Sequence, residues 1–167
     1  MKKKLDGLVA AHSLFHSRKT AVPEYFEGLD PGKLELSRHC LVQKHEWSGR
    51  MVSTTSFQCE TQGPDFPQNL YIASYVHHIE CLAPEESRAL IKQLLDHISK
   101  PKYRYTAEWV QDGDMMIWDN TCVMHRATGG SYEGKYPRDM RRTTVKDMSS
   151  SKFGLNGEGA DWRVGLP

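Results

Sequence analysis

The sequence predicts a mainly β domain with flanking helices. Short segments in which apolar and polar residues alternate recur between residues 38 and 145, which is the pattern of half-buried strands. Glycine, proline and Asx residues separate these segments, as turns require. A segment near the middle of the chain has instead the leucine and isoleucine spacing of a helix with one buried face. A chain of 167 residues, 38% hydrophobic and 26% charged, is long enough for one domain with its own core.

Helices are predicted at 2–14 and at 83–99. In the first, apolar residues and His12 fall on one helical face, although Gly7 lowers the helix propensity. The second has a proline and two glutamates in its first turn, and Pro101 ends it. The predicted strands are 38–46, 70–74, 103–109, 115–117, 121–127 and 138–145.

Bulk composition excludes several classes of function. The formal net charge of +1 gives no electrostatic case for nucleic-acid binding. No apolar run approaches the length of a membrane span, and no signal-peptide segment follows the N-terminal lysines. We therefore expect a cytoplasmic protein with no nucleic-acid or membrane partner. The four cysteines lack Cys-x-x-Cys spacing and are expected to be thiols: Cys40, Cys59, Cys81 and Cys122.

The stretch 114–144 contains a candidate site. Asp119 suits a tight turn, and the strand after it carries His125, an imidazole that can bind a metal. Arg138 and Arg142 are four residues apart, so a strand places both on one face. A guanidinium binds a carboxylate through two parallel hydrogen bonds, so metal and arginine together would hold a keto acid at both ends. The alternatives are an ordinary polar histidine and a solvated, charged edge strand.

The motif Trp118-Asp119-Asn120-x-x-x-x-His125-Arg-Ala-Thr, followed by Arg138-x-x-Arg-Arg-Thr-Thr, resembles the C-terminal half of the taurine/2,4-dichlorophenoxyacetate dioxygenase family. Members of that family are Fe(II)- and 2-oxoglutarate-dependent oxygenases. The resemblance implies the C-terminal part of a double-stranded β-helix, which is a jelly-roll, cupin-like fold. Their iron site is a triad of two histidines and one carboxylate.

By that resemblance, His125 is the distal histidine of the iron triad. Arg138 pairs with the distal carboxylate of 2-oxoglutarate, and Arg142 lies near the substrate or cosubstrate. Residues 118–120 are structural near the site. The implied partners are Fe(II), 2-oxoglutarate, dioxygen and a small anionic or carbonyl-bearing substrate, such as an aryloxyacetate, a sulfonate or a xanthine-like compound.

The resemblance also divides the chain. Residues 1–148 correspond to the C-terminal portion of a single dioxygenase domain, and 149–167 form a tail rich in glycine and serine. Residues 52–68 interrupt the match and are either a loop insertion or a retained intron. The other two iron ligands, spaced His-x-Asp or His-x-Glu, precede the matching part in the family. We therefore expect a truncated chain that is inactive alone.

Two further hypotheses stay open. The chain could be a non-catalytic remnant of the fold that acts, if at all, as a binding or regulatory protein. It could instead be a different cupin-type metal protein that uses His77, His78, Glu80 and His125. A homo-oligomer is compatible with each hypothesis.

Overall fold

The computed structural model describes residues 2–44, 68–136 and 139–157. Of the predicted interruption at 52–68, all but Gln68 lies outside the described residues. The α-helices are α1 (Lys2–Leu5), α2 (Leu14–Ala21) and α3 (Pro84–Ile98). The strands are β1 (Val9–His12), β2 (Ser37–Cys40), β3 (Val42–Lys44), β4 (Gln68–Leu70) and β5 (Val76–Ile79). Short 3-10 helices are η1 (Pro23–Phe26), η2 (Pro31–Lys33) and η4 (Pro101–Tyr103).

The prediction of one helix over residues 2–14 is wrong. Helix α1 ends at Leu5, and Gly7 follows it with φ +78°, a left-handed conformation that glycine adopts without steric cost. The chain then extends into β1 and re-enters a helix at α2, where the Ser13 side chain accepts the amide N–H of His16 as an N-cap. Because β1 is extended, its apolar residues fit a sheet instead of a helical face.

Strand β1 is the centre of a three-stranded antiparallel sheet with the order β2-β1-β5. Ala10 lies opposite His39 on one side and opposite Ile79 on the other. Strands β3 and β4 form a separate two-stranded antiparallel ladder. Strands β2 and β3 together cover most of the strand predicted at 38–46, whereas β4 overlaps the strand predicted at 70–74 only at Leu70. The described residues thus form an open sheet flanked by helices, and they do not close into a jelly roll.

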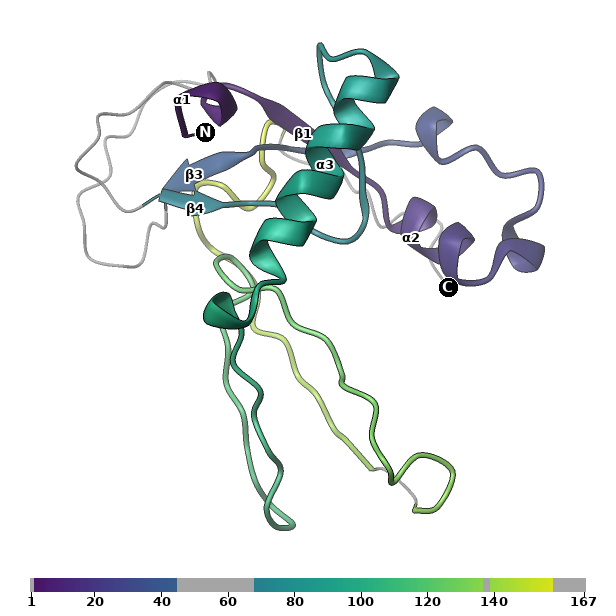
Figure 1. Cartoon of the computed structure of the whole chain (residues 1–167), viewed down its shortest axis with the longest axis vertical. Coiled ribbons are helices and arrows are strands. Elements are labelled where there is room, and N and C mark those ends of the chain that lie inside the picture. Colours follow the sequence, from purple (N-terminus) through teal and green to yellow (C-terminus); the bar gives the residue numbers. More distant parts are fainter. Residues whose placement is uncertain (1, 45–67, 137–138, 158–167) are drawn as a thin grey trace.

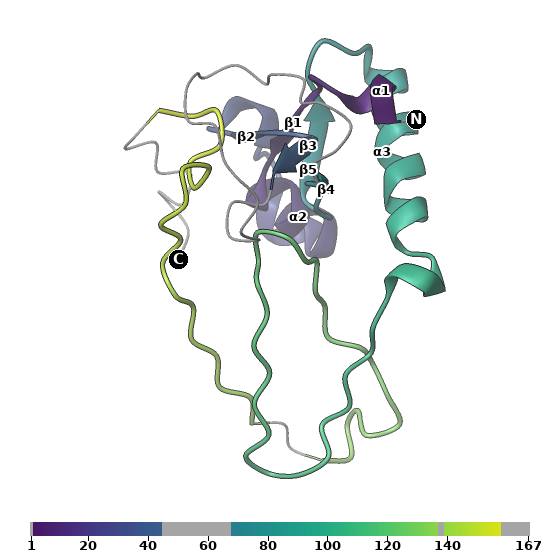
Figure 2. The same ribbon diagram turned by 90° about the vertical axis from the view of Figure 1, so that its left-hand side faces the viewer.

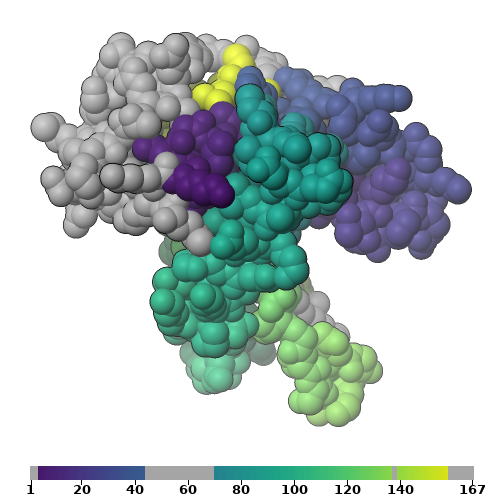
Figure 3. Space-filling model, turned by 45° about the horizontal axis from the view of Figure 1, so that its top comes forward, coloured from purple at the N-terminus to yellow at the C-terminus, as the bar shows by residue number. Residues whose placement is uncertain are grey.

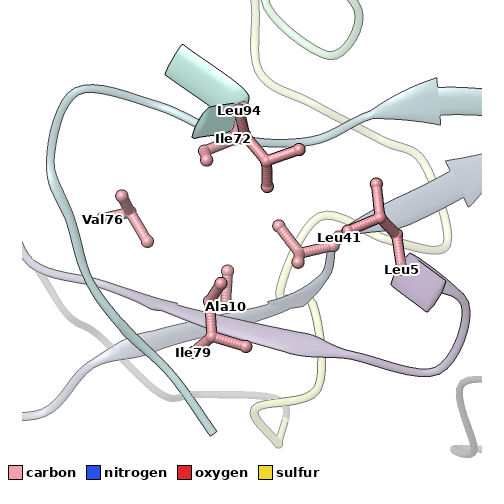
Figure 4. Close-up of a cluster of buried hydrophobic side chains, with 7 residues drawn as sticks. All are labelled: Leu5, Ala10, Leu41, Ile72, Val76, Ile79 and Leu94. Carbon is pink, nitrogen blue, oxygen red and sulfur yellow. The ribbon is translucent and has the colours of Figure 1, made fainter. Parts of the chain in front are cut away.

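A small apolar core lies between this sheet and helix α3, which packs along it (Figures 1 and 2). Figure 4 shows Leu94 of α3 pointing toward the side chains of the strands and their connections. Leu41, Ile79 and Leu94 are fully buried. The cluster consists of Leu5, Ala10, Leu41, Ile72, Val76, Ile79 and Leu94.

Helix α3 confirms the predicted helix almost to the residue. Pro84 occupies its first turn, and the acidic residues beside it complement the positive end of the helix dipole. A buried hydrogen bond fixes the helix to the sheet, because the backbone N–H of Ile79 donates to Ser87 Oγ over 2.8 Å. The helix therefore belongs to the core and is not a surface addition.

Two extended arms leave this body after η4 (Figures 1 and 2). The first arm spans residues 104–118 and the second 119–148. Figure 3 shows their tips as separate lobes beside the packed body. The strands predicted at 103–109, 115–117, 121–127 and 138–145 are wrong for the described residues, since none of these joins a ladder. Met115 and Ile117, expected to be half-buried, are more than 80% exposed.

The expectations about membrane spans and cysteines can also be compared with the structure. Within the parts of the chain that the structure describes, no helix has the length and apolar character needed to cross a membrane. Cys40 is disulfide-bonded, so the expectation of four thiols is wrong for this residue. Cys81 and Cys122, the other two cysteines among the described residues, are free.

Candidate functional site

The turn before His125 forms as the sequence predicts. Asp119 Oδ1 accepts the backbone N–H of Thr121 over 2.8 Å and its hydroxyl over 2.6 Å, which is an Asx turn. The backbone N–H of Val123 also donates to the Asp119 carbonyl oxygen. On the outer side of the turn, Trp118 Nε1 donates to Asn120 Oδ1 over 2.8 Å. These local bonds fix the direction in which the second arm leaves the turn.

His125 lies on the outgoing leg of the second arm and is exposed. Its only ring contact among the described residues is with Trp118, with ring centroids 4.7 Å apart and planes inclined by 48°. The indole therefore packs against the imidazole, and the His125 residue as a whole stays exposed. A histidine held in this way is available to a ligand that approaches from outside the arm.

One of the two candidate arginines, Arg142, lies among the described residues. Arg138 lies outside the described residues, and Arg142 is exposed on the returning leg of the arm. The neighbouring Arg141 pairs with Asp139 at 3.3 Å, and both side chains are largely exposed. Throughout the described ranges, no group of three or more histidine, cysteine, aspartate or glutamate side chains could hold a metal ion. Among the described residues of the candidate site, Trp118 and His125 are in contact.

The loop that links the two legs of the second arm borders an open hollow of about 310 Å³. The Tyr132 hydroxyl closes the loop by donating to the Thr128 carbonyl oxygen over 2.5 Å. Glu133 is the one charged side chain among the described residues that line the hollow. The lining residues are Ala127, Thr128, Gly129, Tyr132, Glu133, Gly134 and Tyr136.

The cupin-type set is not assembled among the described residues. Glu80 is held by Arg38, whose Nε and Nη2 donate to the two carboxylate oxygens over 2.5 and 2.8 Å. This hydrogen bonding lowers the pKa of Glu80 and keeps it charged. His77 and His78 contact each other, with their Nδ1 atoms 2.9 Å apart, but His125 lies on the separate arm. Glu80, which directly follows the last residue of β5, therefore forms an ion pair with Arg38.

Sequence reasoning missed a buried imidazole–phenol cluster formed by His12, His39, Tyr71 and Tyr75. The His12 ring makes edge contacts with the other three rings at centroid distances of 5.5–5.8 Å. His12 is 2% exposed and His39 7%. His12 Nδ1 bonds to the Ser37 carbonyl oxygen, whereas His12 Nε2 and His39 Nδ1 have no hydrogen-bond partner within the described part of the chain.

Burial sets the protonation of this cluster. Desolvation lowers the pKa of His12 to about 4, and desolvation followed by repulsion from His12 lowers the pKa of His39 to about 4. Burial also raises the pKa of Tyr71 to about 12. All these rings are therefore neutral at neutral pH. The strand predicted at 38–46 could have located His39, but His12 could be found only by assigning β1 as a strand.

Most of the sequence is similar to proteins of one known family. Residues 1–144 match the model of the family described as "Taurine catabolism dioxygenase TauD, TfdA family". An alpha-ketoglutarate-dependent 2,4-dichlorophenoxyacetate dioxygenase from Burkholderia sp. (strain RASC) is 32% identical over 144 residues, which are 86% of this chain and 42% of that protein. A (S)-phenoxypropionate/alpha-ketoglutarate-dioxygenase from Sphingobium herbicidovorans is 32% identical over 136 residues, which are 77% of this chain and 40% of that protein.

The chain spans less than half the length of the curated relatives it matches. Among solved structures, AAD-2 in complex with Mn(II) and N-oxalylglycine matches with a TM-score of 0.47 and 23% identity. That match covers 65% of this chain and 36% of the other.

Proposed function

The chain belongs to the taurine catabolism dioxygenase TauD, TfdA family, and from this we propose that it is the C-terminal part of a 2-oxoglutarate-dependent dioxygenase. The observation that carries the proposal is the family match over residues 1–144, which includes the turn at Asp119, His125, Arg138 and Arg142. The protein would hydroxylate a small organic substrate that is anionic or bears a carbonyl group. Iron(II) and 2-oxoglutarate, when bound, supply the oxidising chemistry.

His125 is the proposed metal ligand. The residue is exposed and its ring packs against Trp118, so it can turn a nitrogen toward an ion without first losing a buried partner. The described residues alone do not fit iron(II), because they hold no group of three ligands. The proposal therefore requires two further protein ligands from outside the described residues, and we derive no reaction step through the metal.

Arg138 is proposed to bind the distal carboxylate of 2-oxoglutarate through two parallel hydrogen bonds. Arg142, four residues along, is proposed to attract the anionic group of the substrate or cosubstrate. Relatives named for 2,4-dichlorophenoxyacetate and (S)-phenoxypropionate make aryloxy acids the first substrates to try. Sulfonates and xanthine-like compounds are the other two classes that such a cation suits.

The test measures succinate formation from 2-oxoglutarate, with iron(II) and each substrate class, by the product of the complete gene. We expect His125→Ala to abolish succinate formation. Arg138→Gln should raise the KM for 2-oxoglutarate at least about tenfold, because a charge-assisted bidentate contact is lost. Arg141→Gln is the matched control, since this exposed arginine has no assigned role, and it should leave both kinetic constants unchanged.

The alternative is a non-catalytic remnant that acts as a binding or regulatory protein. The lack of a three-ligand group among the described residues favours this alternative. If no substrate class stimulates succinate formation, and iron(II) binding is the same in the His125→Ala variant, the dioxygenase proposal is rejected and the remnant takes its place.

A further inference from the structure

Two neighbouring histidines lie on strand β5 where its pairing with β1 is irregular. The antiparallel register places Ala11 opposite His78. It then places His12 opposite Val76, so that His77 is an extra residue in this ladder. Such a β-bulge bends its strand and changes the direction of the side chains beside it. Regular strand geometry would place two adjacent imidazoles on opposite faces of the sheet. The bulge instead brings the two rings together, with their Nδ1 atoms 2.9 Å apart.

That separation suits two nitrogens that share one metal ion. Imidazole nitrogens bind divalent transition metals at about 2.0–2.1 Å, so two ligands at a right angle around the ion are about 2.9 Å apart. Two tetrahedral ligands would be about 3.3–3.4 Å apart by the same geometry. The observed distance therefore fits a tetragonal ion such as Cu(II) better than a tetrahedral zinc site. The two ring planes are inclined by 83°, and the last torsion of a histidine turns easily, so both nitrogens can face one ion.

The other ring nitrogen of His77 lies near a carboxylate. A Cβ added to Gly32 would be 3.4 Å from Asp30 Oδ1 and 3.7 Å from His77 Nε2, so both atoms border the same space. A histidine that binds a metal through one nitrogen commonly directs its other N–H at a carboxylate, which fixes the tautomer and the ring orientation. Asp30 also attracts a cation, although Lys33 lies 4.0 Å from its Oδ2 and opposes this attraction.

The surroundings of the pair keep an imidazole ready to bind. Both histidines are half-buried, so neither is sealed in the core. Burial, followed by repulsion from His78 and His16, lowers the pKa of His77, which leaves its ring neutral at neutral pH. The His16 ring on α2 meets the His77 ring edge-on, with centroids 5.3 Å apart, and limits its rotation. Glu80, the nearby carboxylate at the end of β5, is occupied by Arg38 and is not a ligand.

We propose that His77 and His78 form a two-nitrogen chelate for a divalent transition-metal ion of tetragonal preference, with Cu(II) as the best fit. The ion replaces the hydrogen bond between the two Nδ1 atoms, and the proton of that bond moves to Nε2 of the same ring. The described ranges supply no group of three or more side chains that could hold a metal, so the chelate has two protein ligands and water completes the coordination. It does not include His125 and is independent of the proposed dioxygenase.

The test titrates Cu(II) into the full chain, prepared without a histidine tag and carrying His125→Ala, which removes the metal ligand of the proposed dioxygenase. We expect one equivalent to bind, with two nitrogens around the copper in its electron paramagnetic resonance spectrum. His77→Gln and His78→Gln should each raise the Kd at least about tenfold, because one of the two linked ligands is lost. His97→Gln is the matched control, since this half-buried histidine lies on α3 with its ring against Tyr103, and it should leave the Kd unchanged.

A second measurement leaves the histidine pair intact. A substoichiometric amount of Cu(II) should broaden the ring resonances of His77 and His78 and leave those of His97 sharp. The Ile79 amide, which donates to Ser87 Oγ, reports the fold and should stay protected from exchange in every variant. Where a substitution removes that protection, the broadening decides the question. The proposal is overturned if either glutamine variant of the pair binds Cu(II) as tightly as the chain with both histidines. A copper spectrum with one nitrogen, or equal broadening at all three histidines, also overturns it.

Discussion

The body of the molecule and its two arms have the same alternating pattern of apolar and polar residues, but the body is packed and the arms are exposed. Both contain short alternating segments separated by turn residues, but only in the body do such segments pair and bury their apolar side chains. In the arms, Tyr105, Ile117 and Val145 are each more than 80% exposed. The difference shows that alternating residues place apolar side chains on one face of a strand. Those side chains are buried only where another element packs on that face.

In the body that element is helix α3, whose Leu94 and neighbours close over the sheet (Figure 4). No helix or sheet among the described residues does the same for the arms. An extended segment without a partner strand leaves its backbone groups to water and gains no burial that offsets its lost conformational entropy. Among the described residues, the arms are therefore largely exposed, and His125 is exposed with them.

The largest expected effect distinguishes the two regions directly. Leu94→Ala removes a side chain that is 1% exposed at the centre of the core and should lower the free energy of unfolding by about 3 kcal/mol. Ile117→Ala makes a comparable deletion at an arm position that is 84% exposed and should change it by less than about 0.5 kcal/mol. Urea unfolding followed by circular dichroism measures both. Equal losses in the two variants would mean that the arm is packed in solution.

For each of the two buried histidines, an effect of similar size should come from acid. The pKa values of His12 and His39 are lowered from 6.5 to about 4 in the folded chain, so between these pH values the unfolded chain binds more protons than the folded one. Stability is therefore complete above pH 6.5 and is lost as pH falls toward 4. The expected loss is on the order of 3 kcal/mol for each ring, and so on the order of 6 kcal/mol for the two together. Charged groups near His39 include Asp147, which opposes the shift.

The variant His39→Gln tests the source of that loss, because it removes one of the two titrating rings. The free energy of unfolding should then fall less steeply between pH 6.5 and 4, because only His12 still titrates. The arms contain neither ring, so the exchange rates of their amide hydrogens should not change. An unchanged slope would assign the acid sensitivity to groups outside the buried imidazole–phenol cluster.

These two regions also explain what the sequence could and could not predict. Helix α3 and the turn at Asp119 follow from residues within a few positions of one another, and both form. Strand β1 was predicted as part of a helix because its neighbours on the sheet, β2 and β5, are more than twenty residues away. The ladders expected in the arms failed for the same reason, since pairing is decided by distant segments.

The candidate site shows the same division. Short-range chemistry predicted the turn that precedes His125, and the structure adds the supporting contact with Trp118. The juxtaposition of His125 with Arg138 and Arg142 requires the two legs of the second arm to meet, and it remains a prediction. The family match supports that prediction through the residues it covers, not through their positions in space.

The smallest effect concerns the arm alone. Asp119→Ala removes the acceptor of the Thr121 amide and hydroxyl, so the turn loses both Asx bonds while the body keeps all of its contacts. The global free energy of unfolding should change by less than about 0.5 kcal/mol. Exchange of the Thr121 amide hydrogen should become faster, because its hydrogen bond is local and half-exposed. Exchange of the Ile79 amide hydrogen, which is donated to Ser87 within the core, should not change.

Asp119→Asn is the matched control, since an amide oxygen can still accept the Thr121 N–H. If Asp119→Ala also accelerated exchange at Ile79, the arm and the body would be one cooperative unit, and the contrast between them would be a matter of exposure and not of stability.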